Sequence, residues 1–250
     1  MNPSFYRAPY FGPDASFRAY GVQHGVVLLV ATALFALAVL YARRGDAARE
    51  HRFGAFFGWL PLGVWAVFNA FRSITGDWTK QVDLPLNLCP LMAFVLPFVL
   101  TRVRSRRAFE VSYFFVLGGC IQALITPNLV EGFPHYEFVR YWLLHCSLVW
   151  AVLYAILVFG ERPTLRGLGL AAVAFVVYIA VVKGLNTLLG TNYAFTQHKP
   201  ETSSLLDHLG PYPLYIATGT LMALALFALV YIPIAVEGYR QRRRARLSVG

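Results

Sequence analysis

The chain has 250 residues, of which 58% are hydrophobic and 14% are charged, and its formal net charge is +10. A typical soluble domain carries about 25% charged residues, so the composition argues against a disordered tail or a soluble globule and predicts a polytopic membrane protein. The basic residues form short clusters between apolar stretches, with no continuous stripe of basic and aromatic residues. This pattern argues against nucleic acid as a partner.

Seven apolar stretches reach or approach the length of about 20 residues that a membrane-spanning helix needs. The third stretch is the shortest, and its Pro90 and Pro97 predict a kinked or partly irregular span. We therefore expect a single all-α transmembrane domain over residues 1–250. Its seven spans are predicted at residues 21–42, 53–71, 86–101, 109–127, 138–159, 166–186 and 211–236.

The orientation of the spans is predicted from the basic residues in the short loops, because Lys and Arg concentrate on the cytoplasmic side. Most of the 22 Lys and Arg residues follow the first, third, fifth and seventh spans. This asymmetry predicts an outer N-terminus and a cytoplasmic C-terminus, which agrees with an odd number of spans.

Polar side chains are unevenly distributed along the predicted spans. Ionisable and amide groups are costly in a bilayer and usually face the bundle interior or a wet cavity. Here they lie in the outer halves of the spans, and several are three or four residues apart, which places them on one helix face. The sequence predicts an outward-facing polar pocket with binding residues His24, Asn69, Arg72, Asn87, Gln122, Thr126, Tyr141 and Asn186, and with His145 about two turns into the fifth span.

The longest outer connection covers residues 187–210. Loops of this length often act as lids or binding elements. We expect Asp207 and His208 to line the pocket from above, together with tyrosines of the same segment. An alternative for these aromatic residues is a role as ordinary anchors at the membrane interface.

Cys89 and His145 are the candidate catalytic residues, because they are predicted at a similar depth in the outer half. A cysteine becomes a nucleophile when a neighbouring base or positive charge favours its thiolate. Such a pair suits acyl transfer, with an amide of Asn87 or Gln122, or Arg72, stabilising the oxyanion. The alternative is structural, since a buried cysteine is usually a small hydrophobic residue and an intramembrane histidine can simply join two helices.

The two other cysteines, Cys120 and Cys146, are predicted to pack against neighbouring helices. Cys120 follows Gly118 and Gly119, which allow helices to approach closely. No CxxC, HExxH, P-loop, dinucleotide-binding or GxSxG motif occurs. The sequence therefore predicts neither a metal site nor a cofactor.

Four stretches resemble the YwaF-like family of bacterial integral membrane proteins. They are DLPLNLCPLM at 83–92, GGCIQALITPNL at 118–129, FPHYEFVRYWLLHC at 133–146 and the segment at 192–215 that contains SSLLDHLGPYPLY. The animal relatives of this family include an acyltransferase with a proposed cysteine acyl-enzyme, which acts on ether phospholipids. The resemblance implies Cys89 as nucleophile, His145 as its histidine and a phospholipid or fatty-acyl substrate.

The sequence departs from this family at Asn87, where many relatives have histidine in an LPLHLC motif. A mechanism that needs a second histidine beside the cysteine would then have to use His24 or His208.

We therefore expect a lipid acyltransferase or fatty-acyl ester hydrolase in a bacterial cytoplasmic membrane. One alternative is a binder or transporter of a small polar or anionic ligand, without covalent chemistry. Another is a structural partner of other membrane proteins, in which the polar residues would only join helices.

Overall fold

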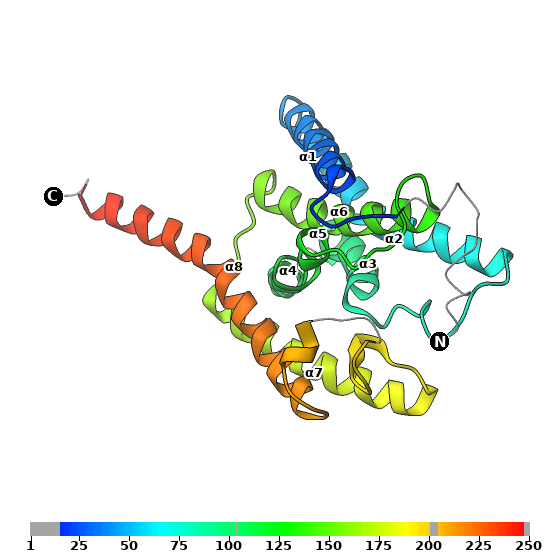
Figure 1. Ribbon diagram of the computed structural model, residues 1–250. Helices are drawn as coiled ribbons and strands as arrows, with labels where there is room; N and C mark the ends of the chain where they lie inside the picture. Colours follow the sequence, from blue (N-terminus) through cyan, green and yellow to red (C-terminus); the bar gives the residue numbers. More distant parts are fainter. Residues whose placement is uncertain (1–15, 104, 201–204, 248–250) are drawn as a thin grey trace.

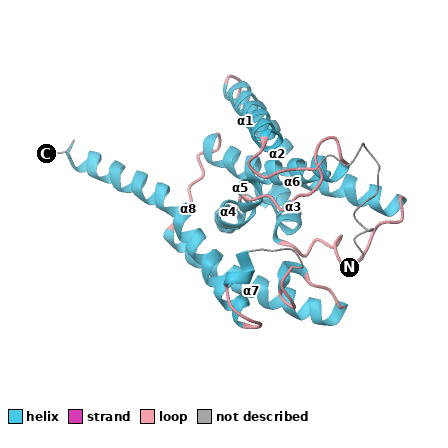
Figure 2. Cartoon of the chain, viewed as in Figure 1, coloured by secondary structure: helices cyan, strands magenta, loops and turns pink. Residues whose placement is uncertain are grey.

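The structure is a computed structural model that describes residues 16–103, 105–200 and 205–247. Within these ranges the chain is helical and has no β-strand (Figure 2). An isolated bridge pairs Ser16 with Glu131. The α-helices are α1 (Val22–Arg43), α2 (Ala47–Ile74), α3 (Leu88–Phe98), α4 (Arg106–Phe114), α5 (Gln122–Ile125), α6 (Tyr136–Leu157), α7 (Leu165–Leu189) and α8 (Leu214–Leu247). Two π-helices, η2 (Val99–Val103) and η3 (Phe115–Cys120), and two 3₁₀-helices, η4 (Tyr193–Phe195) and η5 (Leu205–His208), connect them.

Six of the described helical segments are long and apolar enough to cross a membrane: Val22–Arg43, Ala47–Ile74, Arg106–Ile125, Tyr136–Leu157, Leu165–Leu189 and Leu214–Gln241. The protein is thus a helical, multi-pass membrane-type protein. The third predicted span corresponds to a shorter apolar helical segment, Leu88–Thr101. It is short because Pro97 and the π-helix η2 interrupt regular α-helical bonding near its end. Seven complete spans and the orientation remain predictions.

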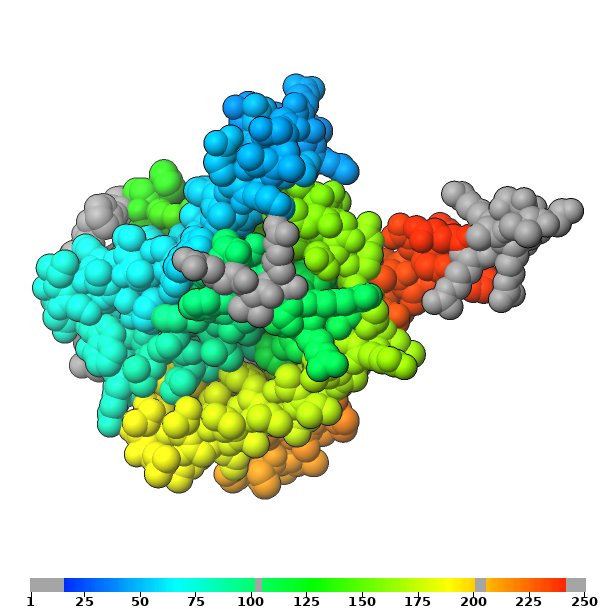
Figure 3. All heavy atoms as spheres, turned by 180° about the vertical axis from the view of Figure 1, so that it is seen from behind, coloured from blue at the N-terminus to red at the C-terminus, as the bar shows by residue number. Residues whose placement is uncertain are grey.

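The centre of the bundle consists of α6 and the helical stretch from α4 to α5. In the most apolar window of each, 56% of the residues are buried, compared with 6% in α8. α1 and the C-terminal part of α8 project from this body (Figures 1 and 3), and α7 and the start of α8 cover one side of it. Apolar side chains cover most of α1, of α7 and of Leu214–Gln241 in α8, as expected for helices that face lipid.

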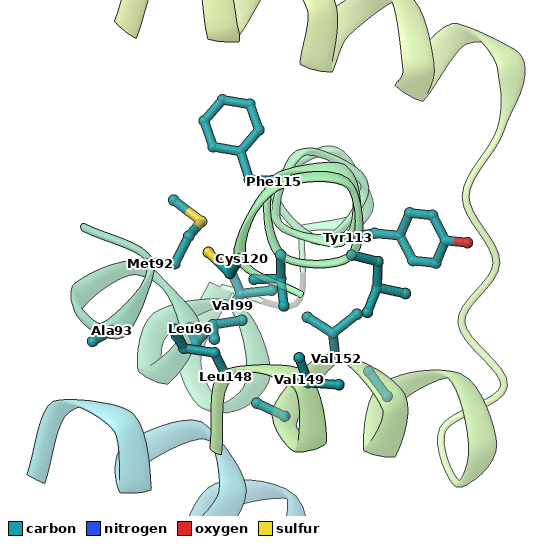
Figure 4. Close-up of a cluster of buried hydrophobic side chains, with 14 of the residues drawn as sticks. Met92, Ala93, Leu96, Val99, Tyr113, Phe115, Cys120, Leu148, Val149 and Val152 are labelled. Atoms are coloured by element: carbon teal, nitrogen blue, oxygen red, sulfur yellow. The ribbon is translucent and has the colours of Figure 1, made fainter. Parts of the chain in front are cut away.

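The core between α3, η3 and α6 is aliphatic and aromatic. Figure 4 shows Met92 and Leu96 of α3 beside Cys120 of η3, with Val149 and Val152 of α6 below them. The two glycines before Cys120 let η3 pack closely against two helices, Gly118 against α8 and Gly119 against α3, as their sequence predicts. A Cβ atom on Gly118 would lie 2.3 Å from Phe227, and one on Gly119 would lie 2.5 Å from the end of the Leu88 side chain. The start of α3 therefore packs directly against η3.

Candidate functional site

Cys89 is the second residue of α3 and is half-buried. The helix begins here because Asn87 has an extended backbone (φ −72°, ψ 154°) and Pro90 fits the first helical turn, where its missing N–H costs no hydrogen bond. The first N–H groups of a helix have no intrahelical acceptor and favour negative charge nearby. The location of Cys89 is therefore favourable for a thiolate.

The side chain of Cys89 interacts with two other side chains, those of Cys120 and His145. Cys120 is the last residue of η3, and His145 lies in the middle of α6. The structure thus brings the two predicted catalytic residues together, and it adds Cys120, which was predicted only to pack. Two tyrosines, Tyr141 of α6 and Tyr178 of α7, interact electrostatically with Cys89. We call these five residues the Cys89 group.

The orientation of His145 leaves one ring nitrogen for Cys89. Its Nδ1 lies 2.7 Å from the Tyr141 carbonyl oxygen, and its ring centroid lies 4.3 Å from that of Tyr141. A carbonyl oxygen only accepts, so Nδ1 carries the proton and donates it. In the neutral ring Nε2 is then an acceptor and has the form that a general base needs.

Tyr141 and Tyr178 hold the backbone on either side of the Cys89 group. The hydroxyl of Tyr141 donates to the carbonyl of Ala123 at 2.8 Å, three residues after Cys120. The hydroxyl of Tyr178 donates to the carbonyl of Leu86 at 2.9 Å, three residues before Cys89. Each phenol therefore ties one thiol-bearing segment to a neighbouring helix.

The loop after α7 also holds the segment that leads to Cys89. The Tyr193 hydroxyl donates to the Lys80 carbonyl at 2.7 Å and accepts the Leu84 N–H at 2.9 Å. Burial raises the pKa of Tyr193 to about 12, so this phenol stays protonated near neutral pH. The Asn87 side-chain oxygen accepts the Ala194 N–H at 2.9 Å. The Asn87 carboxamide oxygen is therefore used to join α3 to this loop.

Asn186 organises the same loop from the end of α7. Its side chain is buried and makes four hydrogen bonds: it donates to the Tyr193 carbonyl and the Thr196 hydroxyl, and it accepts from the Thr191 hydroxyl and the Tyr193 N–H. Gly190 at φ +66° supplies the left-handed turn that ends α7. All four hydrogen-bonding positions of the amide are filled, so Asn186 shapes the loop from within.

Arg72 is fully engaged by protein groups. Its Nε and Nη2 bind the Asp83 carboxylate at 2.7 and 3.1 Å, and Nη2 also donates to the Asp77 carbonyl. Its Nη1 donates to the Tyr136 hydroxyl and lies 3.9 Å from a Glu137 carboxylate oxygen. The side chains of Arg72 and Asp83 are 7% and 6% exposed. The buried pair joins α2 to the segment before α3 and to α6, and every nitrogen of the guanidinium has a protein partner.

His24 is buried, and both of its ring nitrogens have partners. Nδ1 accepts the Tyr20 N–H at 2.9 Å, so Nε2 carries the proton that is donated to the Leu124 carbonyl at 2.9 Å. The ring also packs against Trp142, with centroids 5.3 Å apart. His24 thus joins the start of α1 to α5 and α6, and neither of its nitrogens is left to replace a second histidine beside Cys89.

Three further predicted binding residues differ in how much of their hydrogen-bonding capacity is left open. Asn69 donates from Nδ2 to the Trp65 carbonyl at 3.1 Å, while its buried Oδ1 has no hydrogen-bond partner. Thr126 is exposed and donates its hydroxyl back to the Gln122 carbonyl at 3.0 Å. Gln122 is half-buried at the start of α5, two residues after Cys120. Of these, Asn69 presents an open buried acceptor.

Asp207 and His208 lie on η5 and are exposed. This short helix rests on the start of α8: Leu206 and Leu209 approach Gly219, and the Thr218 hydroxyl donates to the Leu209 carbonyl at 2.7 Å. These contacts direct the segment to α8 and not to the Cys89 group.

A cavity of about 310 Å³ lies at the opposite end of the bundle. It is bordered by the start of α2, η2, the start of α4 and the chain after α6, with lining residues that include Glu50, Phe109 and Glu161. It is therefore separate from the Cys89 group. Within residues 16–103, 105–200 and 205–247, no group of three or more His, Cys, Asp and Glu residues could hold a metal ion.

The sequence pointed to Cys89, His145 and Tyr141, and it gave Cys120 only a packing role. It missed Tyr178 of the Cys89 group and Asp83, the partner of Arg72. Tyr178 was missed because it lies in a stretch with no other polar residue nearby, and Asp83 because it precedes the third predicted span. A usable signal for Asp83 was its place just before that span, since a charge at a helix entrance needs a partner such as Arg72.

The helices and this hydrogen-bonded group at one end define a multi-pass helical membrane protein with a cysteine–histidine pair inside the bundle. Its sequence matches the TMEM164 family over residues 19–231, and the chain therefore belongs to that family. A relative from Treponema pallidum (strain Nichols), described as an uncharacterized protein, is 26% identical over 223 residues. The match covers 87% of this chain and 90% of the relative. No solved structure matches the chain.

Proposed function

We propose that the protein is a membrane-embedded lipid acyltransferase or fatty-acyl ester hydrolase that acts through a Cys89 acyl-enzyme. The observation that carries this proposal is the interaction of Cys89 with His145, whose Nδ1 is fixed on the Tyr141 carbonyl. A cysteine beside a histidine of defined tautomer is the arrangement that nucleophilic catalysis requires. The resemblance to YwaF-like proteins supports the same pair.

In the first step, Nε2 of His145 takes the Cys89 thiol proton, and the sulfur attacks the carbonyl carbon of a lipid ester. A carbon–sulfur bond forms, the ester carbon–oxygen bond breaks, and His145 gives the proton to the departing lipid oxygen. In the second step, the oxygen of an acceptor hydroxyl or of water attacks the thioester carbon; a carbon–oxygen bond forms and the carbon–sulfur bond breaks. His145 takes the proton of the attacking group and returns it to the sulfur, so the enzyme is restored.

The surroundings support these steps. The N–H groups in the first turn of α3 are suited to stabilise the oxyanion, because they lack intrahelical acceptors. Asn69 of α2 has a buried Oδ1 with no hydrogen-bond partner among the described residues, and we propose that this oxygen accepts the hydrogen of a substrate hydroxyl. The half-buried Gln122 is the remaining predicted amide near Cys120. Among the predicted binding residues, Arg72 and Asn186 serve this site by holding its frame.

The test is intact mass spectrometry of the purified protein after incubation with phospholipid vesicles. We expect wild type to gain an acyl mass that hydroxylamine removes, because hydroxylamine cleaves thioesters. Cys89→Ser should lack this adduct. Cys146→Ser is the matched control, since Cys146 packs against aromatic residues near α1, and it should keep the adduct.

An adduct that persists in Cys89→Ser, or its absence from wild type with every phospholipid supplied, would overturn the proposal. In the second case a non-covalent role would gain support: binding of a labelled lipid that survives Cys89→Ser would indicate a ligand binder or transporter.

We also propose that the protein resides in a bacterial cytoplasmic membrane with its N-terminus outside, which places the Cys89 group in the outer leaflet. The arginine-rich flanks support this orientation. A cysteine introduced at Arg44, between α1 and α2, should be protected from an impermeant maleimide added to intact cells. Labelling of that cysteine in intact cells would reverse the orientation.

A further inference from the structure

Tyr178 is buried, unlike most of the residues around it on α7. Only 22% of the most apolar window of this helix is buried, but Tyr178 is 9% exposed. Its ring packs against Phe115 and Phe175, with centroids 6.4 and 5.9 Å apart. Phe115 of η3 contacts the ring from the core, and Phe175 contacts it from the preceding turn of α7. The phenol therefore extends inwards from a helix that otherwise mostly faces lipid.

The Tyr178 hydroxyl donates a hydrogen bond to the Leu86 carbonyl oxygen, 2.9 Å away. Leu86 precedes Asn87, the cap residue of α3, so its carbonyl lies outside the hydrogen-bonding ladder of that helix. The Leu86 N–H turns back to the Leu84 carbonyl at 2.8 Å. Tyr178 therefore anchors a tight turn directly before the helix that carries Cys89.

The hydrogen bond to Leu86 places the phenol three residues before Cys89, and the electrostatic interaction of Tyr178 with Cys89 and Cys120 agrees with that position. A shift of the turn at Leu86 would change the direction of the first turn of α3. For proton transfer, the Cys89 thiol in that turn has to face the imidazole of His145 on α6. Small displacements at such a pair reduce the fraction of molecules in which proton transfer is possible.

We propose that Tyr178 is a positioning residue for the Cys89–His145 pair: by holding the Leu86 carbonyl, its hydroxyl fixes the start of α3 so that the thiol faces the imidazole. The inference rests on the proposed function for the nucleophilic role of Cys89. The positioning itself requires no lipid substrate, so the two can be tested separately.

The test is a double-mutant cycle on the reactivity of Cys89. Purified full-length wild type, Tyr178→Phe, His145→Ala and the double variant are treated with iodoacetamide at one pH, and the alkylation of each cysteine is followed by peptide mass spectrometry. Tyr178→Phe keeps the ring and removes only the hydroxyl. We expect it to slow Cys89 alkylation about fivefold, the effect of one lost neutral hydrogen bond.

The double variant should be no slower than His145→Ala alone, because the hydroxyl acts through the histidine. Cys146 in the same molecules reports on general loosening of the helices, and its rate should not change. Tyr113→Phe is the matched control: Tyr113 is also buried, and its hydroxyl donates to the Val230 carbonyl at 2.7 Å, between α4 and α8. It should leave Cys89 alkylation unchanged.

Additive effects of Tyr178→Phe and His145→Ala would overturn the inference, as would an equal loss in Tyr113→Phe or a parallel change at Cys146. A non-additive cycle in a protein that forms no acyl adduct would uphold the positioning role and reject the acyl chemistry. An acyl adduct together with an additive cycle would support the acyl chemistry and reject the positioning role of Tyr178.

Discussion

Two sets of polar residues share one end of the bundle, and they differ in how completely the protein satisfies them. Arg72, Asn186 and His24 have protein partners at every nitrogen and oxygen that their side chains offer. His145 uses one ring nitrogen for the backbone and has the other available for Cys89. The comparison teaches that a polar residue inside a membrane protein is a candidate for chemistry only when part of its bonding capacity is left open.

The largest expected effect on turnover comes from substituting His145, the residue that keeps one ring nitrogen open. His145→Ala should lower acyl turnover by about 10²–10⁴-fold, the range that a general acid–base group contributes. His145→Ala also removes the hydrogen bond to the Tyr141 carbonyl and the ring contact with Tyr141, so the melting temperature in detergent is measured with turnover to separate loss of folding from loss of chemistry. Turnover is measured as release of labelled fatty acid or transfer to an acceptor lipid. Turnover within threefold of wild type would remove His145 from the mechanism.

Arg72→Ala should have the largest effect on stability. It leaves the buried Asp83 carboxylate without its partner, which costs ~3–5 kcal/mol in the free energy of unfolding. Unfolding in mixed micelles with increasing SDS measures this loss.

The double variant Arg72→Ala/Asp83→Ala should recover part of that stability, because it removes both charges. If the double variant is as unstable as the sum of the single variants, the pair is not coupled as the structure describes.

His24→Ala should have an intermediate effect on the free energy of unfolding. It leaves the Tyr20 N–H and the Leu124 carbonyl without partners, at about 1–3 kcal/mol for a buried unsatisfied group. The folded fraction should retain wild-type turnover per molecule, in contrast to His145→Ala. A loss of turnover in well-folded His24→Ala would show that His24 has a catalytic role after all.

Thr126→Val should have the smallest effect. Its hydroxyl is exposed and donates only to the carbonyl four residues earlier. Surface substitutions of this kind change the free energy of unfolding by about 0.5 kcal/mol or less. Both the unfolding midpoint and turnover should match wild type, and a tenfold fall in turnover would place Thr126 in the binding site.

Much of the fold could be predicted from the sequence, because runs of apolar residues are a strong signal for membrane helices. The close approach at Gly118 and Gly119 was also predictable, since small residues inside an apolar helix let neighbouring helices pack closely. The third predicted span is shorter in the structure, as its prolines suggested. Hydrophobicity alone does not show where a π-helix replaces α-helical bonding.

The candidate site was only partly predictable. Spacing places Tyr141 and His145 on one helix face, and the structure keeps them in contact. Spacing within a helix does not reveal which other helix packs beside it, so the approach of Tyr178 from α7 could not be inferred. For the same reason the sequence did not distinguish Arg72, whose hydrogen-bonding groups all have partners, from Asn69, whose Oδ1 has none.

The π-helix η3 has a consequence for comparing relatives of this chain. Relative to an α-helix, a π-helical turn contains an extra residue and changes the rotational phase of everything that follows by about 100°. Cys120 and Gln122 therefore occupy a different helix face from the one that counting from Arg106 would assign. A homologue with one residue fewer within Phe115–Cys120 would turn this cysteine away from α3. In alignments of the family, a single-residue gap at this place should be read as a change of site geometry.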